Sequence, residues 1–246
     1  MGELEHTRRR WIVPGVAVAL VAALGFGIWY FVFRDDAPPA VDLESATQSV
    51  TTDPARSSGG ASLIAGTWTV DISVGDLAAG TASFVGYRVQ EELASIGAKT
   101  AVGRTPGVEG SLTIDGTTIT EVSIVADLTA LTSDSSRRDE TLRDQAIQTG
   151  QFPDATFVLT EPIELGAVPT EGEPITAEAV GTLTIHGVTR PVTIDLEAQL
   201  TEGVIVVTGQ LPIVFADYDI DTPSSFAVLS IEDNGIMELQ LFFAQA

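Results

Sequence analysis

Short runs of alternating apolar and polar residues fill the chain from about residue 65 to residue 246, and they constrain the fold more than any other feature. In the clearest run, Met237, Leu239 and Leu241 share one face, with Glu238 and Gln240 between them. A period of two with one polar face is typical of antiparallel strands that are wetted on one side. The pattern returns at residues 122–128 and 192–198, and in shorter form around Trp68, Leu112, Phe157, Leu183 and Leu211.

Turn signals separate these runs. Asp115-Gly116, His186-Gly187 and Glu202-Gly203 each stand between two alternating segments and predict hairpins. Eight or more short strands in about 180 residues predict a single all-β domain, residues 65–246, folded as a closed barrel or a sandwich. Two segments depart from the pattern and predict helices: residues 90–96 and residues 134–147, the latter with Leu142, Ala146 and Ile147 on one face.

Composition excludes several classes of function. The chain of 246 residues has 12 Lys+Arg against 34 Asp+Glu, and its net charge of −22 would repel a nucleic acid. The absence of cysteine excludes disulfides, thiolate metal sites and a cysteine nucleophile. His6 and His186 are the only histidines, which argues against a multi-histidine metal site. We therefore predict no metal and no cofactor.

Residues 11–33 form a run of 23 without a charged side chain. As a helix this run would reach about 34 Å, enough to cross a hydrocarbon core of about 30 Å. Arg8, Arg9 and Arg10 precede it, while its far end is followed by Arg34 and then by Asp35 and Asp36. The positive-inside rule then predicts residues 1–10 in the cytoplasm and the rest of the chain outside it, on a single-pass cell-membrane anchor.

A cleavable signal peptide is the alternative for this run. Its apolar region usually spans about 7–15 residues and ends at small residues. Here the run is longer and ends in the bulky residues 28–33 (IWYFVF), which favours a retained anchor. Residues 34–64 are rich in Pro, Ser and Thr and have no period, which predicts a flexible linker between anchor and domain.

Several local motifs resemble those of the YceI-like family of exported proteins. The most specific is GTLTIHGVTRPV at residues 181–192, two β runs joined by a His-Gly turn. The others are WTVD at 68–71, SFVGYRV at 83–89, RDETLR at 138–143 and GQFP at 150–153. The resemblance covers about residues 66–243 and leaves out the predicted anchor and linker.

This resemblance implies an eight-stranded antiparallel, lipocalin-like β-barrel with a short helix packed alongside. It also implies a long apolar channel that holds a polyisoprenoid, such as an isoprenoid quinone or a polyprenyl diphosphate. An eight-stranded barrel has an interior wide enough for side chains or one slim ligand, which agrees with that expectation. The channel wall is expected to include Trp68, Val85, Tyr87, Phe157, Leu183, Ile185, Phe215, Leu239 and Leu241.

Two motifs depart from the family pattern. Thr141 stands where the family's Arg-Asp-x-His-Leu-Arg string has histidine, and residues 216–220 (ADYDI) replace its Arg-x-Asp-Phe-Gly element. The second change removes an arginine and leaves Asp217, Asp219 and Asp221 close together. An anionic head group would meet these carboxylates, so a neutral or weakly polar head is the better expectation.

Other candidate sites have simpler structural explanations. His186 beside Gly187 is expected to serve the turn, with its ring bonded to nearby backbone. Arg137, Arg138 and Arg143 could steer an anionic head group, but ion pairs within their own helix are favoured. The Asp217-x-Asp219-x-Asp221 spacing lacks the glycine and the glutamate of an EF-hand.

We therefore predict a membrane-anchored extracytoplasmic protein that holds a long apolar ligand and is not an enzyme. One alternative is an enzyme acting on a prenyl lipid, for which Asp71, Tyr87 and Tyr218 are the mild acid-base candidates. Another is an envelope-stress or interaction module with a filled core. The sequence leaves the oligomeric state open, a homodimer included.

Overall fold

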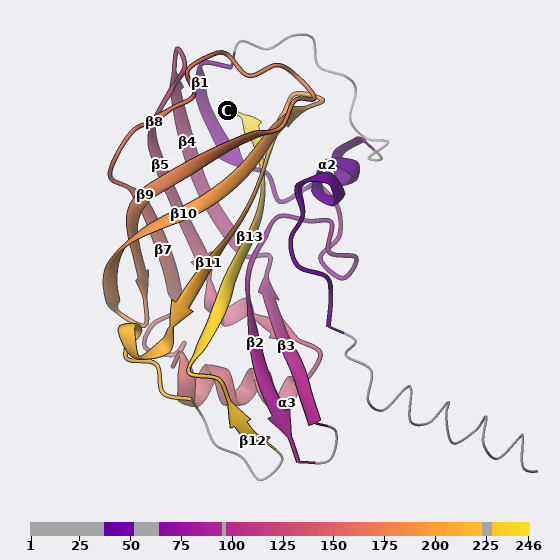
Figure 1. Cartoon of the computed structure of the whole chain (residues 1–246), viewed down its shortest axis with the longest axis vertical. Helices are drawn as coiled ribbons and strands as arrows, with labels where there is room; N and C mark the ends of the chain where they lie inside the picture. Colours follow the sequence, from indigo (N-terminus) through magenta and orange to yellow (C-terminus); the bar gives the residue numbers. More distant parts are fainter. Residues whose placement is uncertain (1–36, 52–63, 95–96, 223–227) are drawn as a thin grey trace, which may run out of the picture.

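Thirteen antiparallel strands in the described part of the chain pair into one continuous sheet (Figure 1). This computed structural model describes residues 37–51, 64–94, 97–222 and 228–246. The strands are β1 (Gly66–Val70), β2 (Phe84–Leu93), β3 (Gly97–Thr105), β4 (Val108–Asp115), β5 (Thr118–Asp127), β6 (Thr132–Ser133), β7 (Asp154–Leu159), β8 (Ile163–Glu164), β9 (Ile175–Ile185), β10 (Val188–Thr201), β11 (Val204–Val214), β12 (Val228–Ile231) and β13 (Asn234–Gln245). The helices are α2 (Leu43–Thr51) and α3 (Ser136–Thr141), with a π-helical turn at Leu142–Ala146 and 3-10 turns at Leu128–Ala130 and Phe215–Tyr218.

Eight of these strands close into a barrel. They follow the order β1-β4-β5-β7-β9-β10-β11-β13, and β13 pairs back with β1 to complete the ring. The eight-stranded antiparallel barrel with a short helix is thereby confirmed. The remaining strands β2, β3, β6, β8 and β12 extend the same sheet beyond the ring.

One edge of β13 is divided between two partners. Its residues 236–240 pair with residues 84–88 of β2, and its last residues 243–245 pair with residues 68–70 of β1. The junction lies at Phe242, whose carbonyl accepts from the Asp71 N–H at 2.7 Å and whose N–H donates to the Ser83 hydroxyl at 3.1 Å. Ser83 in turn donates to the Asp71 carbonyl at 2.8 Å.

Along residues 236–240 of β13 the sheet continues into a wing instead of closing through β1 onto β4. The wing consists of β2, β3 and β6, which pair in that order. It diverges from the barrel at the end where α3 lies (Figure 1). The barrel is therefore a closed ring at one end and flares at the other.

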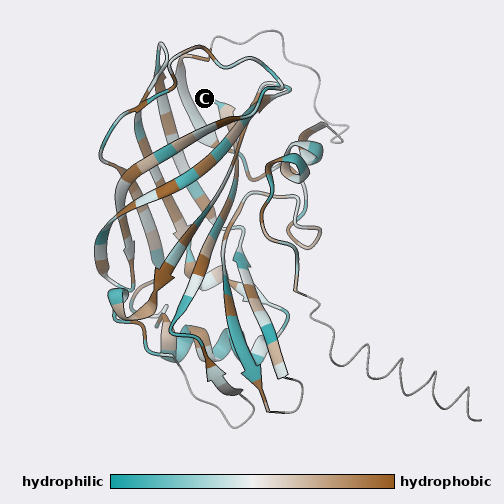
Figure 2. Cartoon of the chain, viewed as in Figure 1, coloured by the Kyte–Doolittle hydropathy of each residue, from teal (hydrophilic) through white to brown (hydrophobic). Residues whose placement is uncertain are grey.

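Apolar and polar residues alternate along the barrel strands (Figure 2). Buried Leu239 and Leu241 belong to the core cluster, as the run at 237–243 predicts. The three predicted hairpins are confirmed, because Asp115 pairs with Thr118, Ile185 with Val188, and Thr201 with Val204. In the last two, both turn residues have a positive φ of 51° to 74°, the conformation that suits a two-residue hairpin.

The helix predicted at residues 134–147 is confirmed as α3 followed by the π-helical turn. Ser135 caps it, since its hydroxyl accepts from the Arg138 N–H at 3.4 Å. The helix predicted at residues 90–96 is wrong, because β2 continues through Leu93 and pairs with β3. Glu91 in this segment is buried against Arg138 of α3, a partner that local periodicity does not reveal.

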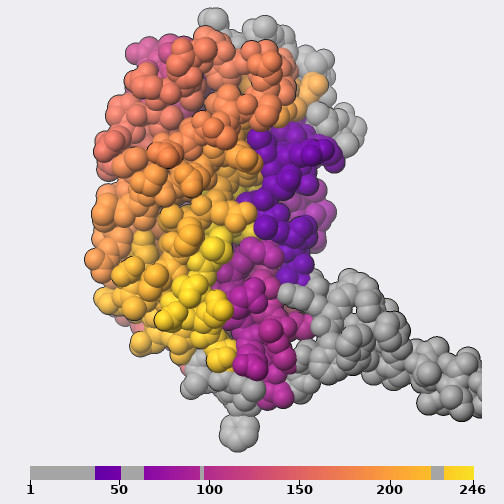
Figure 3. All heavy atoms as spheres, viewed as in Figure 1, coloured from indigo at the N-terminus to yellow at the C-terminus, as the bar shows by residue number. Residues whose placement is uncertain are grey.

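Part of the predicted flexible linker, residues 34–64, is ordered in the structure. Residues 37–51, which we call the strap, lie along the outside of the barrel (Figure 3). Asp42 begins α2, accepting from the N–H groups of Glu44 and Ser45 at 2.9 and 3.2 Å. Buried α2 residues pack on residues from β11, β13 and the segment after β1; the cluster is Leu43, Ala46, Val50, Val74, Val204, Val206 and Phe242.

The strap is also held by two arginines of the wing. Arg88 donates to the Pro38 carbonyl at 2.8 Å, and Arg104 donates to the Pro39 carbonyl at 3.0 Å. Glu238, fully buried, pairs with Arg104 at 2.9 Å and with Arg88 at 3.6 Å. Because a prolyl carbonyl is a strong acceptor, these charges fix the start of the strap to the outer face of the sheet.

The predicted membrane anchor, residues 11–33, lies outside the described residues, as do residues 1–10 and 52–63. Among the residues that the structure describes, no helix has the length and apolarity needed to cross a membrane.

A charge placed in the contact between α2 and the barrel should release the strap. In Val50→Asp, a carboxylate would enter a wholly apolar cluster, at a cost of several kcal/mol that a nine-residue helix cannot offset. We expect hydrogen–deuterium exchange of the intact chain to show lost protection at residues 43–51. Ser45→Asp adds the same charge on the exposed face of α2 and should leave protection unchanged; equal exchange in both variants would contradict the docked strap.

Candidate ligand cavity

Two neighbouring cavities lie within the closed ring and at the flared end of the barrel. The smaller, of about 130 Å³, lies within the closed ring, and the larger, of about 370 Å³, lies between the wing, α3 and the lower barrel. Val85, Ala155 and Met237 contribute to the walls of both. The cavities therefore adjoin at one layer of side chains, and the core is hollow where a filled-core interaction module would be packed.

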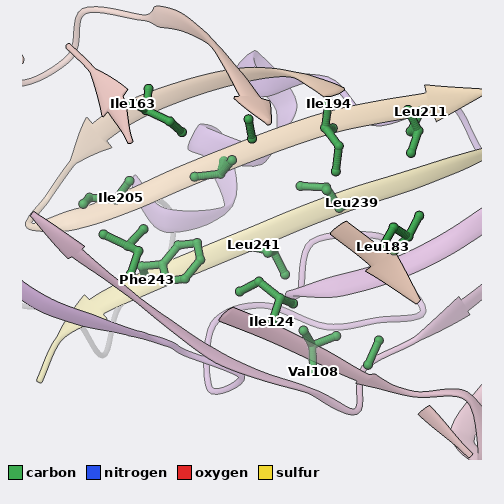
Figure 4. Close-up of a cluster of buried hydrophobic side chains, with 14 of the residues drawn as sticks. Val108, Ile124, Ile163, Leu183, Ile194, Ile205, Leu211, Leu239, Leu241 and Phe243 are labelled. Atoms are coloured by element: carbon green, nitrogen blue, oxygen red, sulfur yellow. The ribbon is translucent and has the colours of Figure 1, made fainter. Parts of the chain in front are cut away.

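The smaller cavity is almost entirely apolar. Side chains from β5, β9, β10, β11 and β13 converge on it, among them Ile124, Leu183, Ile194, Leu239 and Leu241 (Figure 4). Gly181 makes room for one of its aromatic side chains, Phe157. A Cβ at Gly181 would come within 2.5 Å of the Phe157 ring, so only glycine leaves that ring its place.

The larger cavity has an apolar side and a polar side. Every second residue of β2 faces it, from Val85 through Tyr87, Val89 and Glu91 to Leu93. Opposite β2, residues of the helical segment close the space; these are Ser135, Arg137, Arg138, Thr141, Leu142, Ala146 and Ile147. The helix predicted from sequence therefore turns its apolar face to this cavity.

An ion-pair network dominates the polar side. Arg138 donates to Glu91 at 2.6 Å, to the Ser133 hydroxyl at 3.2 Å and to Asp134. Burial lowers the pKa of Arg138, but the bonds to Glu91 and Asp134 outweigh it, so its pKa ends above the ordinary value. Buried Asp139 accepts from the Ser133 hydroxyl at 2.6 Å. The arginine is thus permanently charged and already matched by carboxylates.

Tyr87 lies beside this network. A Cβ at Gly103 would come within 2.3 Å of its ring, so this glycine of β3 provides the room for it. Burial raises the pKa of Tyr87 to about 12, against the lowering effect of nearby Arg138. At neutral pH the phenol is therefore an uncharged hydroxyl.

Eight of the nine residues predicted for the channel wall line a cavity. The smaller cavity has Phe157, Leu183, Leu239 and Leu241, the larger has Tyr87, Ile185 and Phe215, and Val85 reaches both. Trp68 lines neither cavity, so the prediction that it belongs to the wall is wrong. Its indole N–H donates to the Ile64 carbonyl at 2.9 Å, and the side chain is fully buried in the core cluster beside the closed end.

Sequence reasoning missed the residues that give the larger cavity its polarity. Glu91 was assigned to a helix, and its partner Arg138 lies 47 positions away along the chain. No local pattern indicates that pair. Met237, by contrast, belongs to the alternating run of β13, whose periodicity was a sufficient signal for a place in the wall.

The other candidates behave as structural residues. His186 has a φ of 52°, its Nδ1 lies 3.1 Å from the Tyr218 carbonyl and its ring packs edge-on against Phe152, as expected for a turn residue. Arg138 makes the predicted ion pair within its helix, to Asp134, and a second one across to β2. Arg137 lines the larger cavity.

Of the three aspartates in the acidic strip 217–221, only Asp221 lines the larger cavity. Of the acid-base candidates only Tyr87 reaches a cavity, since Asp71 and Tyr218 line neither. Within the described ranges, no three His, Cys, Asp or Glu side chains gather in a way that could hold a metal ion.

A hollow barrel of this topology is found in known proteins, and the YceI-like domain model matches residues 68–243 of this chain. The chain belongs to the YceI-like family. A UPF0312 protein of Vibrio parahaemolyticus is 34% identical over 98 residues, covering 39% of this chain and 48% of that protein. A UPF0312 protein of an Enterobacter strain is 32% identical over 124 residues, covering 49% and 57%. The chain thus spans about half the length of these curated relatives.

Two solved structures share the fold. The polyisoprenoid-binding domain from Saccharophagus degradans, implicated in plant cell wall breakdown, has a TM-score of 0.56 at 21% identity, covering 74% of this chain and 99% of that one. BcnA from Burkholderia cenocepacia has a TM-score of 0.51 at 17% identity, covering 68% and 98%. At these identities the likeness concerns the fold.

The raised pKa of Tyr87 predicts a distinct spectroscopic signature. Of the three tyrosines in the chain, one should ionise near pH 12 when phenolate absorbance is followed during an alkaline titration, and Tyr87→Phe should remove that step. Because an unfolded tyrosine ionises near pH 10, this group stabilises the fold below pH 10 and loses that contribution as pH rises to about 12. Circular dichroism at each pH controls for unfolding; loss of a step near pH 10 in the variant, with none lost near pH 12, would refute the buried position.

Proposed function

We propose that the protein is a lipid-binding protein that holds a long apolar ligand of the polyisoprenoid type in the two adjoining cavities. The observation that carries this proposal is the hollow interior, whose smaller part is almost purely apolar and whose larger part ends in a polar cluster. A chain-like ligand with a polar head matches that order of surfaces. The description of the Saccharophagus degradans domain as polyisoprenoid-binding supports the same assignment.

The hydrophobic effect supplies the affinity in this proposal. Each Å² of apolar surface removed from water contributes about 25 cal/mol, so a prenyl tail gains affinity with every unit that enters the cavity. Ile124, Ile194 and Leu239 surround the inner cavity without offering a polar partner. Such a wall favours hydrocarbon over any polar chain of the same length.

Binding without chemistry is the favoured role. Of the three acid-base candidates named from the sequence, only Tyr87 lies in a cavity wall, and its pKa near 12 makes it a poor proton donor or acceptor at neutral pH. The carboxylate of Glu91 is held by Arg138 at 2.6 Å. These groups are suited to orienting a head group.

We further propose that residues 11–33 anchor the barrel outside the cell membrane. The support is the run of 23 residues without charge and the three arginines that precede it. An anchor of this kind would keep the barrel beside the bilayer, in which long isoprenoids reside.

Blocking the junction of the two cavities tests lipid binding. Ala155 lines both, and Ala155→Phe should prevent a long chain from passing between them. We expect native mass spectrometry of the purified protein to show a bound long-chain lipid in the wild type and its loss in the variant. Val158→Phe places the same ring on the exposed face of the same strand and should retain the lipid. A wild-type protein without extractable lipid that also takes up none would overturn the proposal.

The absence of cysteine allows a clean test of the anchor. In intact cells, a membrane-impermeant maleimide should label Thr193→Cys, on the exposed face of β10, and should label Glu3→Cys only after the membrane is permeabilised. Both variants should resist alkaline extraction from membranes. Labelling of Glu3→Cys in intact cells, or release of the protein by alkali, would contradict the predicted topology.

A further inference from the structure

The polar side of the larger cavity is close to electrically neutral. Its wall includes two arginines, Arg137 and Arg138, and two carboxylates, Glu91 and Asp221. Asp134 adds a further negative charge, since it also pairs with Arg138. A ligand entering here meets no excess of positive charge.

Arg138 is the cation best placed to meet a head group, and it is already occupied. Its two terminal nitrogens bond to Glu91 and Asp134, and one of them also bonds to the Ser133 hydroxyl. Arg137 is exposed, so water screens its charge. A diphosphate moved into this space would lose its hydration and would gain no unpaired buried cation in return.

A hydroxyl group suits the same wall. Carboxylates accept strongly from O–H donors, and Glu91 is buried with its Oε1 at the ion pair. Tyr87, four residues before it on the same face of β2, adds a phenolic hydroxyl to the wall. An alcohol or phenol could bond to these groups without bringing a charge into the cavity.

We propose that Glu91 determines head-group specificity: by neutralising Arg138 it makes the larger cavity select isoprenoids with an uncharged, hydroxyl-bearing head and reject prenyl diphosphates. This inference rests on the proposed lipid-binding function and assigns its ligand class. Glu91 is a binding residue in this scheme, and Asp134 positions the arginine.

The test compares two ligands that differ only in the head. Equilibrium dialysis of the full chain in detergent would use radiolabelled geranylgeraniol and geranylgeranyl diphosphate. We expect the wild type to bind the alcohol about tenfold more tightly than the diphosphate, the ratio that one charge-assisted hydrogen bond accounts for. Equal affinity, or a preference for the diphosphate, overturns the assignment.

Two variants on β2 separate the specific effect from a general change in charge. Glu91→Gln removes the buried carboxylate from Arg138, leaving only the exposed Asp134 as its ion-pair partner, and should shift the ratio toward the diphosphate by about tenfold. Glu92→Gln removes the same charge from the next residue, which is exposed on the opposite face, and should leave the ratio unchanged. The double variant Glu91→Gln/Arg138→Gln has neither charge and should lose the gain in diphosphate binding.

These measurements separate a failure of the role of Glu91 from a failure of the proposed lipid-binding function. If the wild type binds neither ligand and contains no lipid, the lipid-binding function itself fails. If it binds both ligands with a ratio that Glu91→Gln and Glu92→Gln change equally, lipid binding stands and the role of Glu91 is wrong. The wild-type ratio alone decides the ligand class should Glu91→Gln not fold.

Discussion

The rest of the structure depends on one edge of β13, the edge that β11 does not occupy. A strand has two edges, and β11 occupies one of them along eleven residue pairs. The other edge is divided between β1 and β2, and backbone bonds from Asp71 and Ser83 satisfy Phe242 at the point of division. Where β1 takes the edge the ring closes and the interior is narrow; where β2 takes it the sheet diverges and a larger space opens. The difference between the two cavities therefore originates in backbone hydrogen bonding.

The strand β2 shows how one alternating run serves two surfaces. Its odd-numbered residues, Tyr87 and Glu91 among them, face the larger cavity, while Arg88 on the other face holds the strap. On both faces a buried carboxylate balances arginine, Glu91 inside and Glu238 outside. Because unpaired buried charges are costly, this pairing lets a predominantly apolar barrel tolerate polar residues at its flared end.

The fold was largely predictable from the sequence, since period-two runs and His-Gly or Glu-Gly turns are local signals. The same periodicity placed Leu239, Leu183 and Ile185 in cavity walls. It erred where burial depends on distant partners. Glu91 was predicted in a helix, and the ion pair with Arg138 that buries it joins residues far apart in the sequence. Trp68 was predicted in the cavity wall, but its indole N–H is bonded to the Ile64 carbonyl. The residues of α2 were predicted as linker because only three of them form its apolar face.

The docked strap changes the mechanical relation between the barrel and a membrane. A free linker of residues 34–64 would let the domain tumble at a distance from the bilayer. With Pro38 bonded to Arg88, only four peptide units separate the first described residue, Ala37, from Phe33 at the end of the proposed anchor, a contour length of about 14 Å. With so little slack, rotation of the barrel would be restricted and the wing, which walls the larger cavity, would stay near the lipid head groups.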